Sequence, residues 1–84
     1  MRHARAEDLD RLEPLLVRLR ALDGLKEKSR GSFYRGSRAF LHFHEHEGDF
    51  FADLRVADDF ERFAVTTAAE RKALLATIAK VLAK

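Results

Sequence analysis

Two runs of alternating side chains, joined at Glu47-Gly48, constrain the fold of this chain more than any other feature. In the first run, Ala39, Leu41 and Phe43 alternate with Arg38, Phe40, His42 and His44. In the second run, Phe50, Ala52, Leu54 and Val56 alternate with Phe51, Asp53 and Arg55. Successive side chains of a strand point to opposite faces. The pattern therefore predicts an antiparallel hairpin with one aliphatic face and one mixed face.

The turn determines which residues face each other across this hairpin. A turn of two residues or a loop of four residues around Gly48 gives the same pairing, with Leu41 opposite Leu54 and His42 opposite Asp53. Glycine adopts the positive φ that such turns require. A shift of one residue would move Asp53 to the aliphatic face, where an unpaired carboxylate is costly to bury. A three-residue loop with a bulge is the competing geometry.

A helix is predicted ahead of the hairpin, from about Ala6 to Asp23. Leucines recur there at spacings of three and four residues, which is typical of an amphipathic helix. Pro14 either kinks this helix or lies in its first turn, in which case the helix starts at Leu12 or Glu13. Gly24 suits the left-handed position that ends a helix.

Shorter strands and a second helix complete the predicted fold. Ser32 to Tyr34 is predicted as a short strand before the hairpin, and Phe60 to Val65 as a fourth strand after it. A capping box formed by Thr67 and Glu70 predicts a helix through about Leu82. The fold class is therefore α+β: an N-terminal helix, an antiparallel meander of three or four strands and a C-terminal helix, with both helices on the aliphatic face.

The composition is that of one globular domain covering residues 1–84. Charged residues make up 36% and hydrophobic residues 46%, which argues against disorder. There is no cysteine, which excludes disulfides and thiolate metal sites and agrees with a reducing compartment. No apolar run approaches the length of about 20 residues that a membrane helix needs, and the N-terminus lacks the apolar core of a secretory signal. We therefore expect a cytoplasmic protein without a membrane segment.

The mixed face of the sheet is the candidate binding surface. A solvated face would carry threonine, lysine and glutamate, whereas this one combines phenylalanines with histidines and charges, which indicates contact with another molecule. Its predicted residues are Phe33, Arg38, Phe40, His42, His44, Phe51, Asp53 and Arg55. Among them, His44 is expected opposite Phe51 and Phe40 opposite Arg55. Either a helix or loop covers part of this face, or a second copy of the chain packs on it, or it binds a small ligand or another protein.

Three histidines suggest a metal site on this face. His42, His44 and His46 alternate along one strand, which places their side chains about 7 Å apart, close enough for two of them to share a metal ion. Asp53 is a candidate third ligand, or a partner that orients His42. The structural alternative is a cross-strand pair of His42 and Asp53 that stabilises the hairpin, with His44 stacked on Phe51.

The sequence favours a binding domain over an enzyme or a nucleic-acid-binding protein. It contains no nucleophile elbow, phosphate loop or dinucleotide fingerprint, so no cofactor is predicted, and acid–base chemistry by His42 with Asp53 is the remaining catalytic hypothesis. The basic block from Lys26 to Arg38 contains aromatic residues that suit nucleic-acid binding. An acidic block from Glu45 to Glu61 follows it, and the net charge is only +2, which argues against that function.

The segment from Ser32 to Phe40 carries a turn glycine, a basic residue and then an aromatic residue, and it resembles the strand–turn–strand of small bacterial YjbR-like domains. From Leu25 through the C-terminal helix, the chain resembles small bacterial hypothetical proteins with no assigned activity, so the resemblance implies no catalytic residues. The main hypothesis is a small cytosolic association module, a homodimer or a protein-binding domain, that uses the sheet face around the hairpin. The alternative is a small-ligand or metal-binding domain that uses the His42, His44 and Asp53 cluster.

Overall fold

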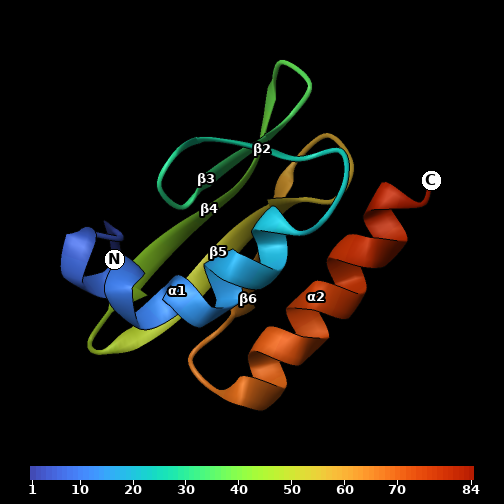
Figure 1. Cartoon of the computed structure of the whole chain (residues 1–84). Helices are drawn as coiled ribbons and strands as arrows, with labels where there is room; N and C mark the ends of the chain where they lie inside the picture. The colour runs from blue at the N-terminus through green and yellow to red at the C-terminus, as the bar shows by residue number, and fades with distance from the viewer.

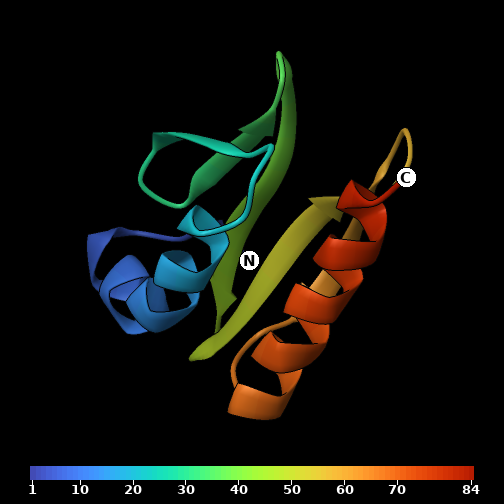
Figure 2. The same cartoon turned by 45° about the vertical axis from the view of Figure 1, so that its right-hand side comes forward.

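The computed structural model describes all 84 residues and has two helices on one face of an antiparallel sheet (Figures 1 and 2). The elements are β1 (Arg2–His3), α1 (Ala6–Arg20), β2 (Lys26–Ser29), β3 (Ser32–Arg35), β4 (Arg38–His46), β5 (Asp49–Arg55), β6 (Phe60–Ala64) and α2 (Ala68–Leu82). This arrangement confirms the predicted α+β class and the position of both helices. Neither helix is long and apolar enough to cross a membrane.

The sheet is a meander with one additional short strand. Its order is β2-β3-β4-β5-β6, and β1 pairs with β4 outside this path. The two strands that the sequence did not predict are β1, which has two residues, and β2, which has the sequence KEKS. Neither contains alternating apolar residues, and lysines are common on exposed edge strands because they discourage pairing with other chains.

β4 and β5 pair in the predicted register, with His42 opposite Asp53. The connection is the two-residue turn, and neither the four-residue loop nor the bulged alternative is present. Its residues, Glu47 and Gly48, have φ values of 52° and 86°. A type I′ turn requires positive φ at both central positions, so the turn fixes the register that the side-chain pattern favours.

A β-bulge in β4 corrects the prediction for Phe33 and Phe40. Phe33 lies opposite Leu41, whereas the next residue, Tyr34, lies opposite Ala39, so Phe40 is the extra residue of the longer strand. The bulge shifts the alternation, and Phe40 and Leu41 are both buried, with exposed fractions of 2% and 1%. Phe33 shares the face of Leu41 because directly opposed side chains lie together. Both phenylalanines therefore belong to the core and not to the mixed face.

The hydrophobic core lies between the sheet and the two helices. α1 contributes Leu12, Leu15, Leu16 and Leu19; α2 contributes Leu74, Ile78 and Val81; and the rest of the chain contributes Phe33, Phe40, Leu41, Phe43, Phe50, Ala52, Leu54 and Val65. The aliphatic face of the central hairpin is thus the covered face, as predicted. Its other face has no helix over it (Figures 1 and 2).

α1 starts at Ala6 and continues through Pro14, which is therefore an interior residue and not part of the first turn. Because proline has no N–H, the carbonyl of Asp10 lacks its usual helical donor. The helix ends at Arg20, earlier than predicted. Gly24 has a φ of 92°, but it lies three residues beyond the C-cap, Ala21, so it does not occupy the helix-ending position predicted for it.

The predicted capping box starts α2. The backbone N–H of Glu70 donates to the Thr67 hydroxyl at 3.1 Å, and the Thr67 N–H donates to the Glu70 carboxylate at 2.9 Å. The N–H of Thr66 donates to the same carboxylate oxygen at 3.0 Å. These bonds satisfy backbone donors that have no partner inside the helix.

Replacing Thr67 with alanine should lower the free energy of unfolding by about 1 kcal/mol, because a helix N–H loses its side-chain acceptor. Thr77→Ala is the matched control, since Thr77 lies within the same helix and its hydroxyl donates only to the carbonyl of Ala73. Alanine has the higher helix propensity, so this control should be as stable as the unmodified chain. Urea unfolding followed by circular dichroism measures both variants, and an equal loss in the two would contradict the capping role.

Candidate functional site

The uncovered face of the sheet carries polar side chains from four strands. His42 on β4 lies opposite Asp53 on β5, which lies opposite Arg62 on β6. In the next row, His3 on β1 lies opposite His44 on β4. Opposed side chains share a face, and so do residues i and i+2 of one strand. These five residues therefore gather in one place, and we refer to them as the His–Asp cluster.

The metal-ligating atoms of three of these residues converge. The Nε2 atom of His42 lies 3.4 Å from Oδ2 of Asp53, and Nε2 of His44 lies 3.0 Å from the same oxygen. One ligating atom from each residue lies within 4.8 Å of the other two. The two strands at the centre of the sheet hold this arrangement, so its geometry depends on backbone pairing and not on a loop.

His44 is the most constrained member of the cluster. Only 9% of its surface is exposed, and its Nε2 atom is buried without a hydrogen-bond partner. Its 3.0 Å approach to Asp53 therefore brings the two groups together without the alignment that a hydrogen bond requires. A buried polar atom without a partner is rare in proteins and calls for an explanation such as an ion or water.

Arg62 neutralises the carboxylate of Asp53. Its Nε donates to Oδ1 at 2.8 Å, and its terminal Nη2 donates to Oδ2 at 2.9 Å. This is the two-pronged geometry in which a guanidinium binds a carboxylate most strongly. The hydrogen bonds from Arg62 lower the pKa of Asp53 against the effect of burial, so Asp53 is ionised at neutral pH. The side chain of Arg62 is about half exposed.

The two histidines are neutral at neutral pH. Burial lowers the pKa of His42 from its ordinary value of 6.5, and it also lowers the pKa of His44. The negative charge of Asp53 raises both pKa values, but by less than burial lowers them. The neighbouring His3 lowers them further. The nitrogen lone pairs of both rings are therefore available to a ligand without prior loss of a proton.

Aromatic rings partly enclose the cluster. The ring centre of His3 lies 4.5 Å from that of His44 and 5.9 Å from that of His42. On the opposite side, the ring of Phe60 lies 4.9 Å from that of His42, in an edge-to-face arrangement. Arg55 lies over Phe60, with its guanidinium carbon 4.4 Å from the ring centre. These contacts reduce access of water to the cluster from two sides.

The other predicted site residues are more dispersed. Phe51 lies opposite His44 and is half-buried, as expected for this face. Arg38 is exposed and lies 4.0 Å from a carboxylate oxygen of Asp58. His46, a candidate metal ligand, is half exposed beside Glu47 and is not among the converging residues. Arg55 donates to the backbone carbonyls of Ala39 and Asp58. Phe40, which was predicted opposite Arg55, is buried in the core.

The basic block between Lys26 and Arg38 does not form one continuous surface. Arg30 is paired with Asp10 and Glu13 of α1. The guanidinium of Arg35 donates to carbonyls at the end of α2. These interactions engage two of the cations that nucleic-acid binding would use.

Three residues at the site were not predicted: His3 and Arg62, which belong to the cluster, and Phe60, which lies beside it. Arg62 could have been found by extending the register across the second hairpin, because the residue opposite Asp53 on β6 is fixed once that turn is placed. His3 has no comparable signal, since β1 is only two residues long.

No protein-family model, curated protein or solved structure matches this chain. The resemblance to YjbR-like domains stays a prediction. The case for a function rests on the geometry of the His–Asp cluster and its surroundings.

The metal-free chain should be more stable at pH 7 than at pH 5. Since the pKa values of His42 and His44 are lowered by folding, the unfolded chain takes up protons below about pH 6.5 before the folded chain does. The contribution of the two neutral histidines to the free energy of unfolding is complete above that pH. It is lost as the pH falls through their pKa values in the folded chain. Urea unfolding in the presence of a chelator measures this dependence.

A double variant, His42→Gln with His44→Gln, should lose less stability between pH 7 and pH 5 than the unmodified chain. His46→Gln is the control, because His46 is exposed and lies outside the cluster, and it should keep the full dependence. If the double variant loses as much stability between pH 7 and pH 5 as the unmodified chain, the pH dependence does not come from His42 and His44.

Proposed function

We propose that this chain is a small metal-binding domain that holds zinc, or a similar first-row divalent ion, through His42, His44 and Asp53. The observation that carries the proposal is the convergence of two imidazole nitrogens and one carboxylate oxygen on a single point, with one of the nitrogens buried and without a partner. Two histidines and one carboxylate form a common ligand set for zinc and for non-haem iron.

The spacing of the ligating atoms supports this proposal. Metal–ligand distances of 2.0–2.2 Å in a tetrahedral site place neighbouring ligand atoms about 3.3 Å apart. The two distances from Asp53 Oδ2, 3.0 Å to His44 and 3.4 Å to His42, lie on either side of that value. The two imidazole nitrogens lie within 4.8 Å of each other, so they must come closer than that limit to share a tetrahedral ion.

The protonation states also support it. Metal binding requires neutral imidazoles and an ionised carboxylate, and these are the states that the lowered pKa values of the cluster favour at neutral pH. Three protein ligands leave at least one coordination position for water or for a small ligand. His3 lies beside both imidazole rings and is a candidate contact for whatever occupies that position.

Titration with zinc, measured by calorimetry, should show one ion bound per chain. His42→Ala should weaken binding by about 100-fold or more, because it removes a direct ligand, whereas losing only an outer partner costs 10- to 100-fold. His46→Ala is the matched control, since it removes a histidine from the same strand but outside the cluster. Equal losses in the two variants, or no binding at stoichiometric zinc, would contradict the proposal.

Arg62→Gln should bind zinc more tightly than the unmodified chain. Arg62 donates to both oxygens of Asp53, so it competes with a metal ion for the carboxylate and repels it by charge. Glutamine removes the charge, and the affected position is half exposed, so the fold should tolerate the change. If Asp53 serves only to pair with Arg62, the variant will be less stable and its zinc affinity will not increase.

As a second candidate, we propose that the uncovered sheet face mediates association, as a homodimer or with another protein. The observation that favours it is the aromatic content of this face, where Phe60 is 37% exposed and Phe51 is half-buried. With Phe33 and Phe40 in the core, this face is less apolar than the sequence predicts. The association is therefore the weaker of the two proposals.

Sedimentation velocity tests the homodimer. If the sheet face pairs, the unmodified chain should sediment as a dimer and Phe51→Asp as a folded monomer, because the substitution places a charge within the contact. Val17→Asp is the control, since Val17 is 53% exposed on α1, away from the sheet. An unmodified chain that sediments as a monomer at tens of micromolar would contradict the homodimer.

A further inference from the structure

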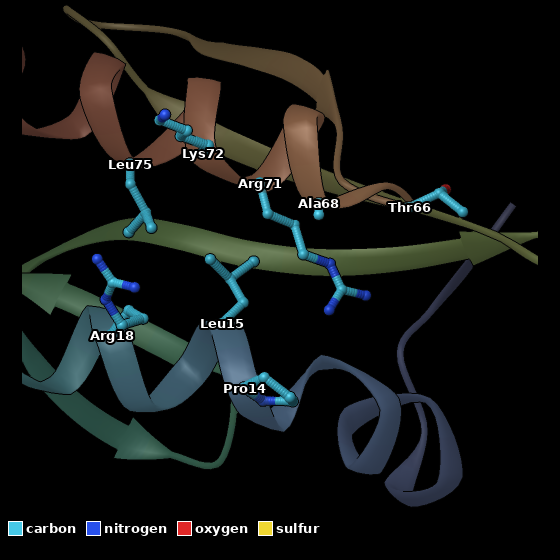
Figure 3. A pocket seen from close by; sticks show the side chains of 8 residues that line it. All are labelled: Pro14, Leu15, Arg18, Thr66, Ala68, Arg71, Lys72 and Leu75. Atoms are coloured by element: carbon cyan, nitrogen blue, oxygen red, sulfur yellow. The ribbon is translucent and has the colours of Figure 1, made fainter.

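A groove of about 420 Å³ lies between α1 and α2 (Figure 3). The His–Asp cluster lies on the opposite side of the sheet. Its apolar lining comes from Pro14 and Leu15 of α1 and from Leu75 of α2. Leu15 is buried and Leu75 is partly buried. Figure 3 shows their side chains approaching each other across the gap between the two helices. The volume is within the usual range for small-molecule sites, about 300–1,000 Å³.

Three cations line the same groove, and none of its lining residues is acidic. Arg18 and Arg71 place their guanidinium groups on either side of Leu15 (Figure 3), and Lys72 lies one residue further along α2. Arg71 donates only to backbone carbonyls, those of Val65 and Arg11. Arg18 and Lys72 make no ion pair, so positive charge predominates among the residues that line the groove. The carboxylate of Glu70 lies near one end of it, where it accepts from the N–H of Thr66.

Several other arginines of the chain have carboxylate partners. On the other side of α1, Arg20 pairs with both Glu13 and Glu27. Across the sheet, Arg62 pairs with Asp53. The guanidinium of Arg18 has neither a carboxylate nor a carbonyl partner. The same holds for Arg5 and Arg11, but of these three only Arg18 lines the groove. A guanidinium with free donors beside a leucine-lined groove is suited to a ligand that has a carboxylate and an apolar tail.

We infer that the groove binds a single-chain carboxylate of medium length, such as decanoate. The carboxylate lies at the guanidinium of Arg18, and the alkyl chain lies along Leu15 and Leu75. The lining of α2 extends from Ala68 to Leu75, which is about 10 Å at 1.5 Å per residue. That length suits a short alkyl chain.

The test is a titration of the full chain with decanoate below its micelle concentration. Calorimetry gives the dissociation constant, and NMR spectra of methyl-labelled leucine locate the ligand. The methyl signals of Leu15 and Leu75 should shift, and those of Leu41 and Leu54 should shift less. Shifts that are larger on the sheet leucines, or no binding at millimolar decanoate, would overturn the inference.

Ligand controls separate the two parts of the recognition. Decanol has the tail without the charge, and acetate has the charge without the tail, so each should bind at least about tenfold more weakly than decanoate. Equal binding of decanol would mean that the cations play no part, and equal binding of acetate would mean that the apolar lining plays none. Binding to phosphatidylglycerol vesicles without binding to monomeric decanoate would point to a membrane surface instead. Each of these results would overturn the inference.

Variants test the cations directly. Arg18→Gln should weaken decanoate binding by about tenfold or more, since a hydrogen bond to a charged group is lost. Arg18 is exposed and makes no ion pair, so this variant should fold normally. Lys80→Gln is the matched control, because it removes one positive charge from α2 outside the groove. An equal effect of both substitutions would show that net charge, and not this groove, determines binding.

Discussion

The pairing of β4 with β5 is the interaction on which the rest of the structure depends. With His42 opposite Asp53, aliphatic side chains of both strands lie under the helices, and the histidines and the carboxylate lie on the other face. If β5 were shifted by one residue against β4, each of its side chains would move to the other face of the sheet. Asp53 would then be buried among leucines. The two-residue turn at Glu47-Gly48 enforces the same register. Core and candidate site are therefore two consequences of one pairing.

The two faces of the sheet differ in the kind of side chain that they bury. On the helix side, burial of apolar side chains stabilises the fold. On the other side, His44 and Asp53 are nearly as buried, with 9% and 8% of their surface exposed, although polar groups are costly to remove from water. Arg62 offsets this cost for Asp53, while Nε2 of His44 has no compensating bond. A bound metal ion would supply that missing partner.

The hairpin and both helices could be predicted because their signals are local. Side chains of period two, a glycine turn and a capping box each act within a few residues. The bulge at Phe40 could not be predicted, because it depends on how β3 docks onto β4. Such docking is a tertiary effect that no local pattern encodes, and it moved Phe33 and Phe40 from the proposed surface to the core. His3 was missed for the same reason, since only its pairing with His44 brings it to the cluster.

The helix groove and the His–Asp cluster lie on opposite sides of the sheet, and they have different electrostatic character. The groove is lined by cations without carboxylate partners, whereas the cluster combines a paired carboxylate with neutral imidazoles. The first suits an anion and the second a metal cation. If both proposals hold, the chain binds ligands of opposite charge on two separate surfaces.

The most direct test of this account is the backbone pairing of the central hairpin in solution. NOE contacts between backbone protons, measured on the isotope-labelled chain, identify which residues face each other across two strands. The account predicts contacts that link His42 to Asp53 and Phe43 to Ala52. Contacts that link His42 to Ala52 or to Leu54 as its directly opposed residue would contradict it, because the histidines and the carboxylate would then lie on different faces.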